Sequence, residues 1–158
     1  MIADEVMEYI GKADEPHIKT VEKGAIRRYA AAVGNDNPLY SDEEYARSSA
    51  WGCIIAPPGF FGWPTKTASS AVGLANVVVD LQAALARAGY PRILDGGISY
   101  EFHLPVRAGD ILSVSPRITG ISEKEGKSGT MIMCSLETSY LNQNGDLVAV
   151  ARQTFIAR

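Results

Sequence analysis

The stretch ISYEFHLPVRAGDILSVSPRITGI, residues 98–121, carries the pattern that decides the fold. In its first part, apolar Ile98, Tyr100 and Phe102 alternate with polar residues until Pro105, which is typical of a half-buried strand. Residues 110–121 contain a second strand-like segment only a few positions later. Two strands this close along the chain predict an antiparallel sheet, because parallel neighbours need a long crossover connection.

Two further strands are predicted towards the C-terminus. Residues 131–140 form the third, after a turn at residues 125–127, and residues 147–157 form the fourth. Asn144 and Gly145 between them are a strong hairpin signal. Four strands in series, joined by short turns, predict an antiparallel meander with one apolar face that needs a cover.

The first half of the chain predicts short helices. Residues 4–10 indicate one helix, with Gly11 as its stop, and residues 17–21 indicate a short strand. A second helix is predicted from apolar residues at helical spacing, with Gly34 as its C-terminal cap: Ile26, Tyr29, Ala30 and Val33. Ser41 and Glu44 fit a capping box for a third helix, from residue 42 to about residue 48.

The segment between these helices and the sheet contains the predicted cover. Pro57 and Pro58 favour an extended backbone, and the small apolar residues from Phe60 onwards predict a buried helix with Pro64 in its first turn. We expect this helix to cover the sheet. Residues 76–88 predict another helix ending at Gly89, although their valine run is also compatible with a strand. The fold class is therefore α+β.

Composition narrows the classes of function. The chain has 158 residues, 46% of them hydrophobic, which is enough for one domain with its own core. A net charge of −3 argues against nucleic acid as a partner. Cys53 and Cys134 lie far apart without metal-ligand spacing, so we expect two small apolar side chains and no metal site. The acidic N-terminus and the lack of a long apolar run predict a cytoplasmic protein that does not enter a membrane.

Four segments, in this order, resemble the MaoC-like dehydratase family, and in particular its N-terminal, fatty-acid-synthase-like type: residues 26–46, 54–60, 98–112 and 138–155. The resemblance covers about residue 21 to the C-terminus. It implies a hotdog fold, in which a curved antiparallel sheet wraps around one central helix and dimerises through the sheet. Residues 1–158 would be a single domain, with residues 1–15 as a short helical extension. It also implies a homodimer, or a heterodimer with a catalytic MaoC-type subunit.

The chemistry implied by the resemblance is the reversible addition of water to a 2-enoyl thioester of CoA or of a carrier protein, without a cofactor. In active members an Asp and a His in the turn Gly-Asp-x-Asn-Pro-(aliphatic)-His-x-Asp activate the water. In this sequence those two positions hold Asn35 and Tyr40, so the catalytic residues stay unassigned. An amide cannot accept a proton at neutral pH, and a phenol with a pKa of about 10 is a poor base.

The resemblance also indicates residues for substrate binding: Asn37, Pro58, Gly59, Phe60 and Trp63. Gly59 would offer its amide to the thioester oxygen, whereas the aromatic residues fit ordinary core packing equally well. The leading hypothesis is a subunit that binds the acyl chain and depends on a partner half for the catalytic Asp and His. Three alternatives stay open: a self-sufficient homodimeric hydratase using Asp36, Tyr40 or His103, a non-catalytic acyl-CoA binder, and a thioesterase. We interpret His103 itself as an ordinary strand residue.

Overall fold

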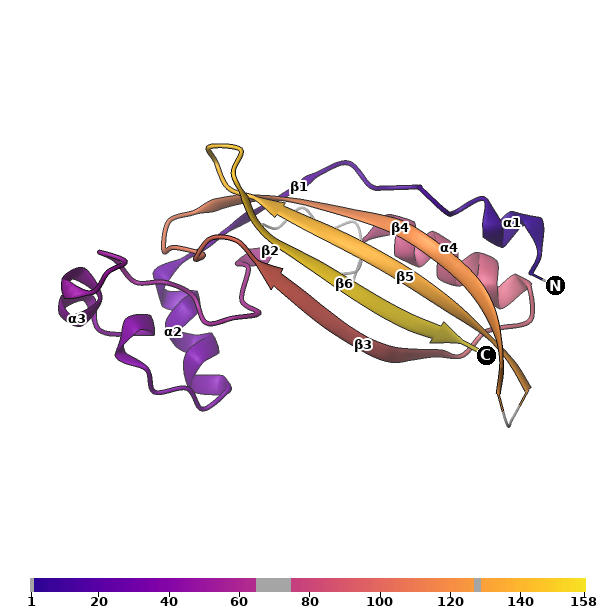
Figure 1. The fold of residues 1–158 in the computed structure, drawn as a ribbon, viewed down its shortest axis with the longest axis horizontal. Coiled ribbons are helices and arrows are strands. Elements are labelled where there is room, and N and C mark those ends of the chain that lie inside the picture. The colour runs from indigo at the N-terminus through magenta and orange to yellow at the C-terminus, as the bar shows by residue number, and fades with distance from the viewer. Residues whose placement is uncertain (1, 65–74, 127–128) are drawn as a thin grey trace.

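A computed structural model describes residues 2–64, 75–126 and 129–158, and its main element is a curved antiparallel sheet (Figure 1). The strands lie in the order β2-β1-β4-β5-β6-β3. Their bounds are β1 (His17–Thr20), β2 (Trp63–Pro64), β3 (Ile93–Phe102), β4 (Ile111–Gly126), β5 (Gly129–Leu141) and β6 (Leu147–Ala157). All four predicted strands and the short strand at residues 17–20 are therefore confirmed.

The order of the strands differs from the predicted meander. Strands β4, β5 and β6 do follow one another, and Gly145 has a φ of 83° in the predicted hairpin turn. However, β3 pairs with β6 and not with β4. The chain after β3 crosses the end of the sheet: His103 N donates to Val148 O on β6, and Gly109 N donates to Val21 O beyond β1. This crossing segment moves β3 to the far edge.

Most of the predicted helices are present, but two of them have different boundaries from those predicted. They are α1 (Asp4–Met7), α2 (Lys23–Ala32), the 3₁₀ helix η1 (Pro38–Tyr40), α3 (Glu43–Ser48) and α4 (Asn76–Arg87). The first helix is shorter than predicted. The capping box is wrong by one residue, because Asp42 caps α3: its Oδ1 accepts hydrogen bonds from Glu44 N at 2.9 Å and Tyr45 N at 3.0 Å.

Within the described residues the helix that covers the sheet is α4. The predicted helix from Phe60 is wrong at residues 60–64, which are not helical. Gly62 has a φ of 78°, and a Cβ there would lie 2.7 Å from Thr20 O, so the chain turns sharply at this point. Trp63 and Pro64 then form β2, paired with β1. The rest of that predicted helix lies at residues 65–74, outside the described residues.

Two apolar cores lie side by side along the sheet. The first is built around α2 and the 54–61 segment, with Leu112, Val114 and Tyr140 from the sheet. The second lies under α4, where Leu81 and Leu85 are fully buried. Cys134 belongs to this second core, and burial raises its pKa to about 12, in agreement with the predicted small apolar role. Cys53 is half-buried.

Strand β3 is exposed, which corrects the prediction of a half-buried strand. The side chains of Ile98 and Phe102 are each 48% exposed, and Tyr100 is 38% exposed. Within the described residues β3 pairs on one edge only, with β6. Tyr100 and Phe102 contact Phe61 of the first core, with ring centroids 5.5 and 6.1 Å away, but much of their surface stays exposed. None of the helices in the described part of the chain is long and apolar enough to cross a membrane.

Candidate functional site

The turn between α2 and α3 is held by its own side chains. Asn35 Oδ1 accepts a hydrogen bond from Asn37 N at 3.2 Å, and Asn37 Oδ1 accepts one from Leu39 N at 3.0 Å, which caps η1. Asn35, Asp36 and Asn37 are all exposed. The concentration of polar groups in this turn therefore has a local structural explanation.

Tyr40 leaves this turn in the opposite direction, into the protein. It is 8% exposed and belongs to the first core. Its side chain lines a cavity of about 380 Å³, which we call the Tyr40 cavity. The other lining residues are Trp51, Ile55, Ala56, Pro57, Pro58, Phe60, Phe102, His103, Leu104, Pro105 and Val106.

Backbone pairing brings these distant segments together. Ala56 N donates to Val106 O at 2.8 Å, and Ala108 N donates to Ile54 O at 3.0 Å. Arg107 secures the neighbouring loop, because its guanidinium donates to Trp51 O at 2.6 Å. The two prolines that follow Ala56 are thereby held beside the end of β3.

The structure brings some of the predicted site residues together and separates others. Tyr40, Pro58 and Phe60 line one cavity. Gly59 lies between the last two with a φ of 90°, and a Cβ on it would lie 3.3 Å from the Tyr29 hydroxyl. Asn35 and Asn37 do not line this cavity. The side chain of Trp63 lies outside the described residues.

His103, which the sequence analysis kept only as an alternative catalytic residue, lines this cavity. It follows the last residue of β3, and its Nε2 lies 3.5 Å from Glu101 Oε1. The sequence signal was Pro105, which ends the strand and turns the chain across the sheet. His103 therefore lies just beyond the strand, where its side chain lines the same cavity as Tyr40.

The chemistry of the Tyr40 cavity is mostly apolar. Its polar side chains are the Tyr40 phenol, the Trp51 indole and the His103 imidazole, and its lining includes no carboxylate. Among the described residues no group of three His, Cys, Asp or Glu side chains is arranged to hold a metal ion. Such a lining suits an apolar ligand, and the imidazole of His103 adds a polar ring that can donate or accept a hydrogen bond.

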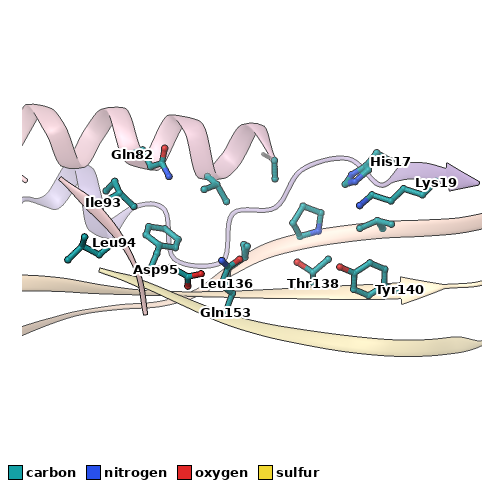
Figure 2. A pocket seen from close by; sticks show the side chains of 15 residues that line it. His17, Lys19, Gln82, Ile93, Leu94, Asp95, Leu136, Thr138, Tyr140 and Gln153 are labelled. Atoms are coloured by element: carbon teal, nitrogen blue, oxygen red, sulfur yellow. The ribbon is translucent and has the colours of Figure 1, made fainter. Parts of the chain in front are cut away.

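A second cavity, of about 270 Å³, lies between α4 and the inner face of the sheet (Figure 2). An aromatic cluster separates it from the Tyr40 cavity. Tyr140 lines the second cavity and stacks on Phe61, with ring centroids 4.1 Å apart. Phe61 in turn stacks on Phe102 of the Tyr40 cavity, at 6.1 Å.

Comparison with solved structures defines the class of fold. The chain is similar to a chain of the ChsH1-ChsH2 complex from Mycobacterium tuberculosis, with a TM-score of 0.77, 18% identity, and coverage of 97% of this chain and 93% of that one. It is also similar to the MaoC-like dehydratase from Rhodospirillum rubrum, with a TM-score of 0.63, 21% identity, and coverage of 99% and 96%. The fold is therefore the hotdog fold.

The family follows from the sequence itself. The family model described as "FAS1-like, dehydratase domain region" matches residues 8–151, and the chain belongs to this family. A protein of Thermomonospora curvata named "Probable enoyl-CoA hydratase alpha subunit" is 31% identical over 132 residues. That match covers 80% of this chain but 41% of the relative's own length. The resemblance to MaoC-like dehydratases is confirmed.

Proposed function

We propose that this chain is a hotdog subunit of an acyl-thioester hydratase–dehydratase. It binds the acyl chain of a 2-enoyl or 3-hydroxyacyl thioester, of CoA or of a carrier protein, and a partner half supplies the catalytic Asp and His. The reaction needs no cofactor, because the thioester activates its own double bond. A cytoplasmic location fits two cysteines that are both free thiols.

One observation carries this proposal: the family's catalytic positions have lost their titrating groups while the cavity beside them persists. Asn35 uses its amide oxygen within the turn, and Tyr40 presents a phenol to an apolar cavity without a carboxylate. General acid–base catalysis contributes about 10²–10⁴-fold in rate, so a chain without these groups is a weak catalyst alone. The similar ChsH1-ChsH2 structure is that of a complex, which supports pairing with a second kind of chain.

The exposed strand β3 is the edge that we assign to the partner. Its outer edge is unpaired in the described structure, and its apolar side chains are exposed. An unpaired edge with apolar side chains favours strand-to-strand association. Docking a second hotdog sheet there would also close the Tyr40 cavity, because Phe102 and His103, at the end of β3, line that cavity.

The test is a reconstitution assay. The chain is mixed with a MaoC-type subunit that contains the family's Asp and His, and hydration of a 2-enoyl-CoA is followed by loss of the enoyl absorbance. The expected result is a rate in the mixture that exceeds the sum of the two separate rates by at least tenfold. Full activity of the purified chain alone would overturn the proposal. Release of CoA thiol would identify a thioesterase, and tight acyl-CoA binding with no turnover in any mixture would identify a binder.

A second candidate is a self-sufficient homodimeric hydratase, and the position of His103 favours it. His103 lines the same cavity as Tyr40, so an imidazole base and a phenol donor face one ligand space. If the purified chain is active, His103→Gln should lower its kcat by about 10²-fold or more. Asp36→Asn should leave it unchanged, because Asp36 is exposed and lies outside the cavity lining.

A further inference from the structure

The second cavity, which we call the Lys19 cavity, occupies the junction of the two cores. Val114 and Tyr140 of the first core line one part of it, and Val78 and Phe155 of the second core line another. A gap at this place is unusual, because protein interiors are packed to the density of organic crystals. The space is open along the inner face of the sheet, beneath α4 (Figure 2).

Polar side chains occupy inward positions of the strands around this cavity. On β5, Ile132 and Cys134 are buried, and side chains at every second position share a face, so Leu136, Thr138 and Tyr140 face inward as well. The neighbouring strand β6 presents Gln153 beside the buried Phe155. These inward positions would bury apolar side chains if the face served only as a core. His17 and Lys19, two residues apart on β1, add two basic groups.

Lys19 has no counter-ion in the described part of the chain. Its ammonium group forms no ion pair or hydrogen bond there, and it lines the cavity together with His17. Burial alone lowers the pKa of Lys19, with no contribution from a nearby carboxylate. Asp95 lines the same cavity, but Figure 2 places it beside Gln153, away from Lys19. A half-buried cation without a partner costs stability unless a ligand supplies the opposite charge.

Two hydroxyl groups line the same cavity as this cation. Figure 2 shows His17 and Lys19 above Thr138 and Tyr140, across the same part of the cavity. Burial raises the pKa of Tyr140 to about 12, so its phenol stays protonated and acts as a donor at neutral pH. An ammonium and two hydroxyl donors match a carboxylate, which accepts several hydrogen bonds at once.

We propose that the Lys19 cavity binds the far end of the acyl group and selects acyl chains that end in a carboxylate, with Lys19 as the cation and Thr138 and Tyr140 as hydroxyl donors. This inference rests on the proposed function, which places the thioester end in the Tyr40 cavity. Phe61 stacks on both Tyr140 and Phe102, so its ring lies between the two cavities and an acyl chain that reaches from one to the other would pass beside it.

The test compares two series of ligands by isothermal titration calorimetry on the complex with the MaoC-type partner. One series is the CoA monothioesters of straight-chain dicarboxylic acids, from hexanedioyl to dodecanedioyl. The other is the simple acyl-CoA esters of the same lengths. We expect at least one dicarboxylic member to bind about tenfold more tightly than its simple counterpart, because its terminal carboxylate can form charge-assisted hydrogen bonds with the cavity.

Variants connect this preference to the cavity. Lys19→Met keeps the length of the side chain and should abolish the preference while leaving simple acyl-CoA binding within about twofold. Thr138→Val, which is isosteric, should reduce the preference by a smaller factor. Lys124→Met is the matched control, because Lys124 is an exposed lysine outside the cavity. An equal affinity for both series, or a preference that survives Lys19→Met, would overturn the inference.

A separate measurement distinguishes failure of the inference from failure of the proposed function. If simple acyl-CoA esters bind but the dicarboxylic series gains nothing, the proposed function stands and the inference fails. If neither CoA series binds, the proposed function fails, and free octanoate against octanamide then tests the cavity directly. Chemical-shift changes at the Lys19 and Thr138 amides with octanoate, lost in Lys19→Met and absent with octanamide, would retain a carboxylate site. The absence of these chemical-shift changes would rule out the carboxylate site.

Discussion

Asn37 has two competing roles that a single substitution separates. The family resemblance assigns it to substrate binding, whereas its Oδ1 accepts a hydrogen bond from Leu39 N at 3.0 Å and caps η1. We expect Asn37→Ala to lower the free energy of unfolding by about 1 kcal/mol, the usual cost of losing a capping oxygen. Acyl-CoA affinity should change by less than about twofold.

The measurement is urea unfolding together with calorimetric titration. Asn37→Asp serves as the control, because a carboxylate oxygen keeps the cap and should retain most of the stability. A large loss of affinity in Asn37→Ala, with the stability unchanged, would assign the residue to the ligand instead.

His17 predicts a pH dependence of stability. Burial is the main cause of its lowered pKa, the charge of Lys19 lowers it further, and Asp14 acts in the opposite direction. The unfolded chain returns His17 to its ordinary pKa of 6.5, so below that pH it binds more protons than the folded chain. The contribution of His17 to stability is therefore present above pH 6.5 and is lost as the pH falls towards the folded pKa.

The comparison is between wild type and His17→Gln, from about pH 7.5 to about pH 5, by urea unfolding at each pH. Asp95 lines the same cavity and is present in both proteins, so it cancels in the difference. We expect the wild type to lose more stability than the variant as the pH falls. Parallel curves for the two proteins would show that His17 does not carry this dependence.

Among the elements, α4 depends on a residue far away in sequence. Asp14 accepts hydrogen bonds from Asn76 N and Val77 N, the latter at 2.8 Å, so a carboxylate from the N-terminal segment caps a helix more than sixty residues away. Its negative charge also lies at the positive end of the helix dipole. We expect Asp14→Ala to lower the free energy of unfolding by about 1–2 kcal/mol.

Asp14→Asn should retain part of this stability through its amide oxygen. Glu15→Ala is the control, because Glu15 is an exposed neighbouring carboxylate. Thermal unfolding followed by circular dichroism gives the comparison. Equal losses for Asp14→Ala and Glu15→Ala would show that charge near the N-terminus matters and that the cap does not.

The sequence predicted the strands of the sheet better than the helix that covers them. Strand alternation is a local pattern, and residues 111–157 show it clearly, so the three hairpin-connected strands were predictable. The sharp turn at Gly62 lies so close to Thr20 O on the neighbouring strand β1 that a Cβ would not fit, and no local pattern records this approach. The small apolar residues after Phe60 therefore suggested a helix start where the chain forms β2.

For the whole molecule, the separation of side chains into two cavities could not be predicted. Tyr40 was identified from the turn, but its companion His103 depends on the path of the crossing segment after β3. The inward position of Thr138 and Gln153 depends on strand register, because a shift by one residue would turn both outwards. Sequence patterns identify the family of the site, whereas its lining depends on pairing between distant segments.

The last prediction concerns assembly through the exposed strand β3. Ile98, Tyr100 and Phe102 are 38–48% exposed, and the outer edge of β3 is unpaired among the described residues. We therefore expect the chain to form a species heavier than its own 17.0 kDa, with a second copy or with its catalytic partner. Ile98→Lys places a charge on this edge and should weaken the association at least tenfold, since burying an unpaired ammonium costs well over about 1.4 kcal/mol.

Ile111→Lys is the matched control for this assembly. Ile111 is 47% exposed against 48% for Ile98, but it lies on β4, between β1 and β5. Sedimentation velocity over a range of concentrations gives the two association constants, and urea unfolding verifies that both variants fold. Because the two substitutions add the same charge at equal exposure, a loss confined to Ile98→Lys locates the contact at the β3 edge. Equal losses, or none in Ile98→Lys, would mean that this sheet edge does not bind the partner.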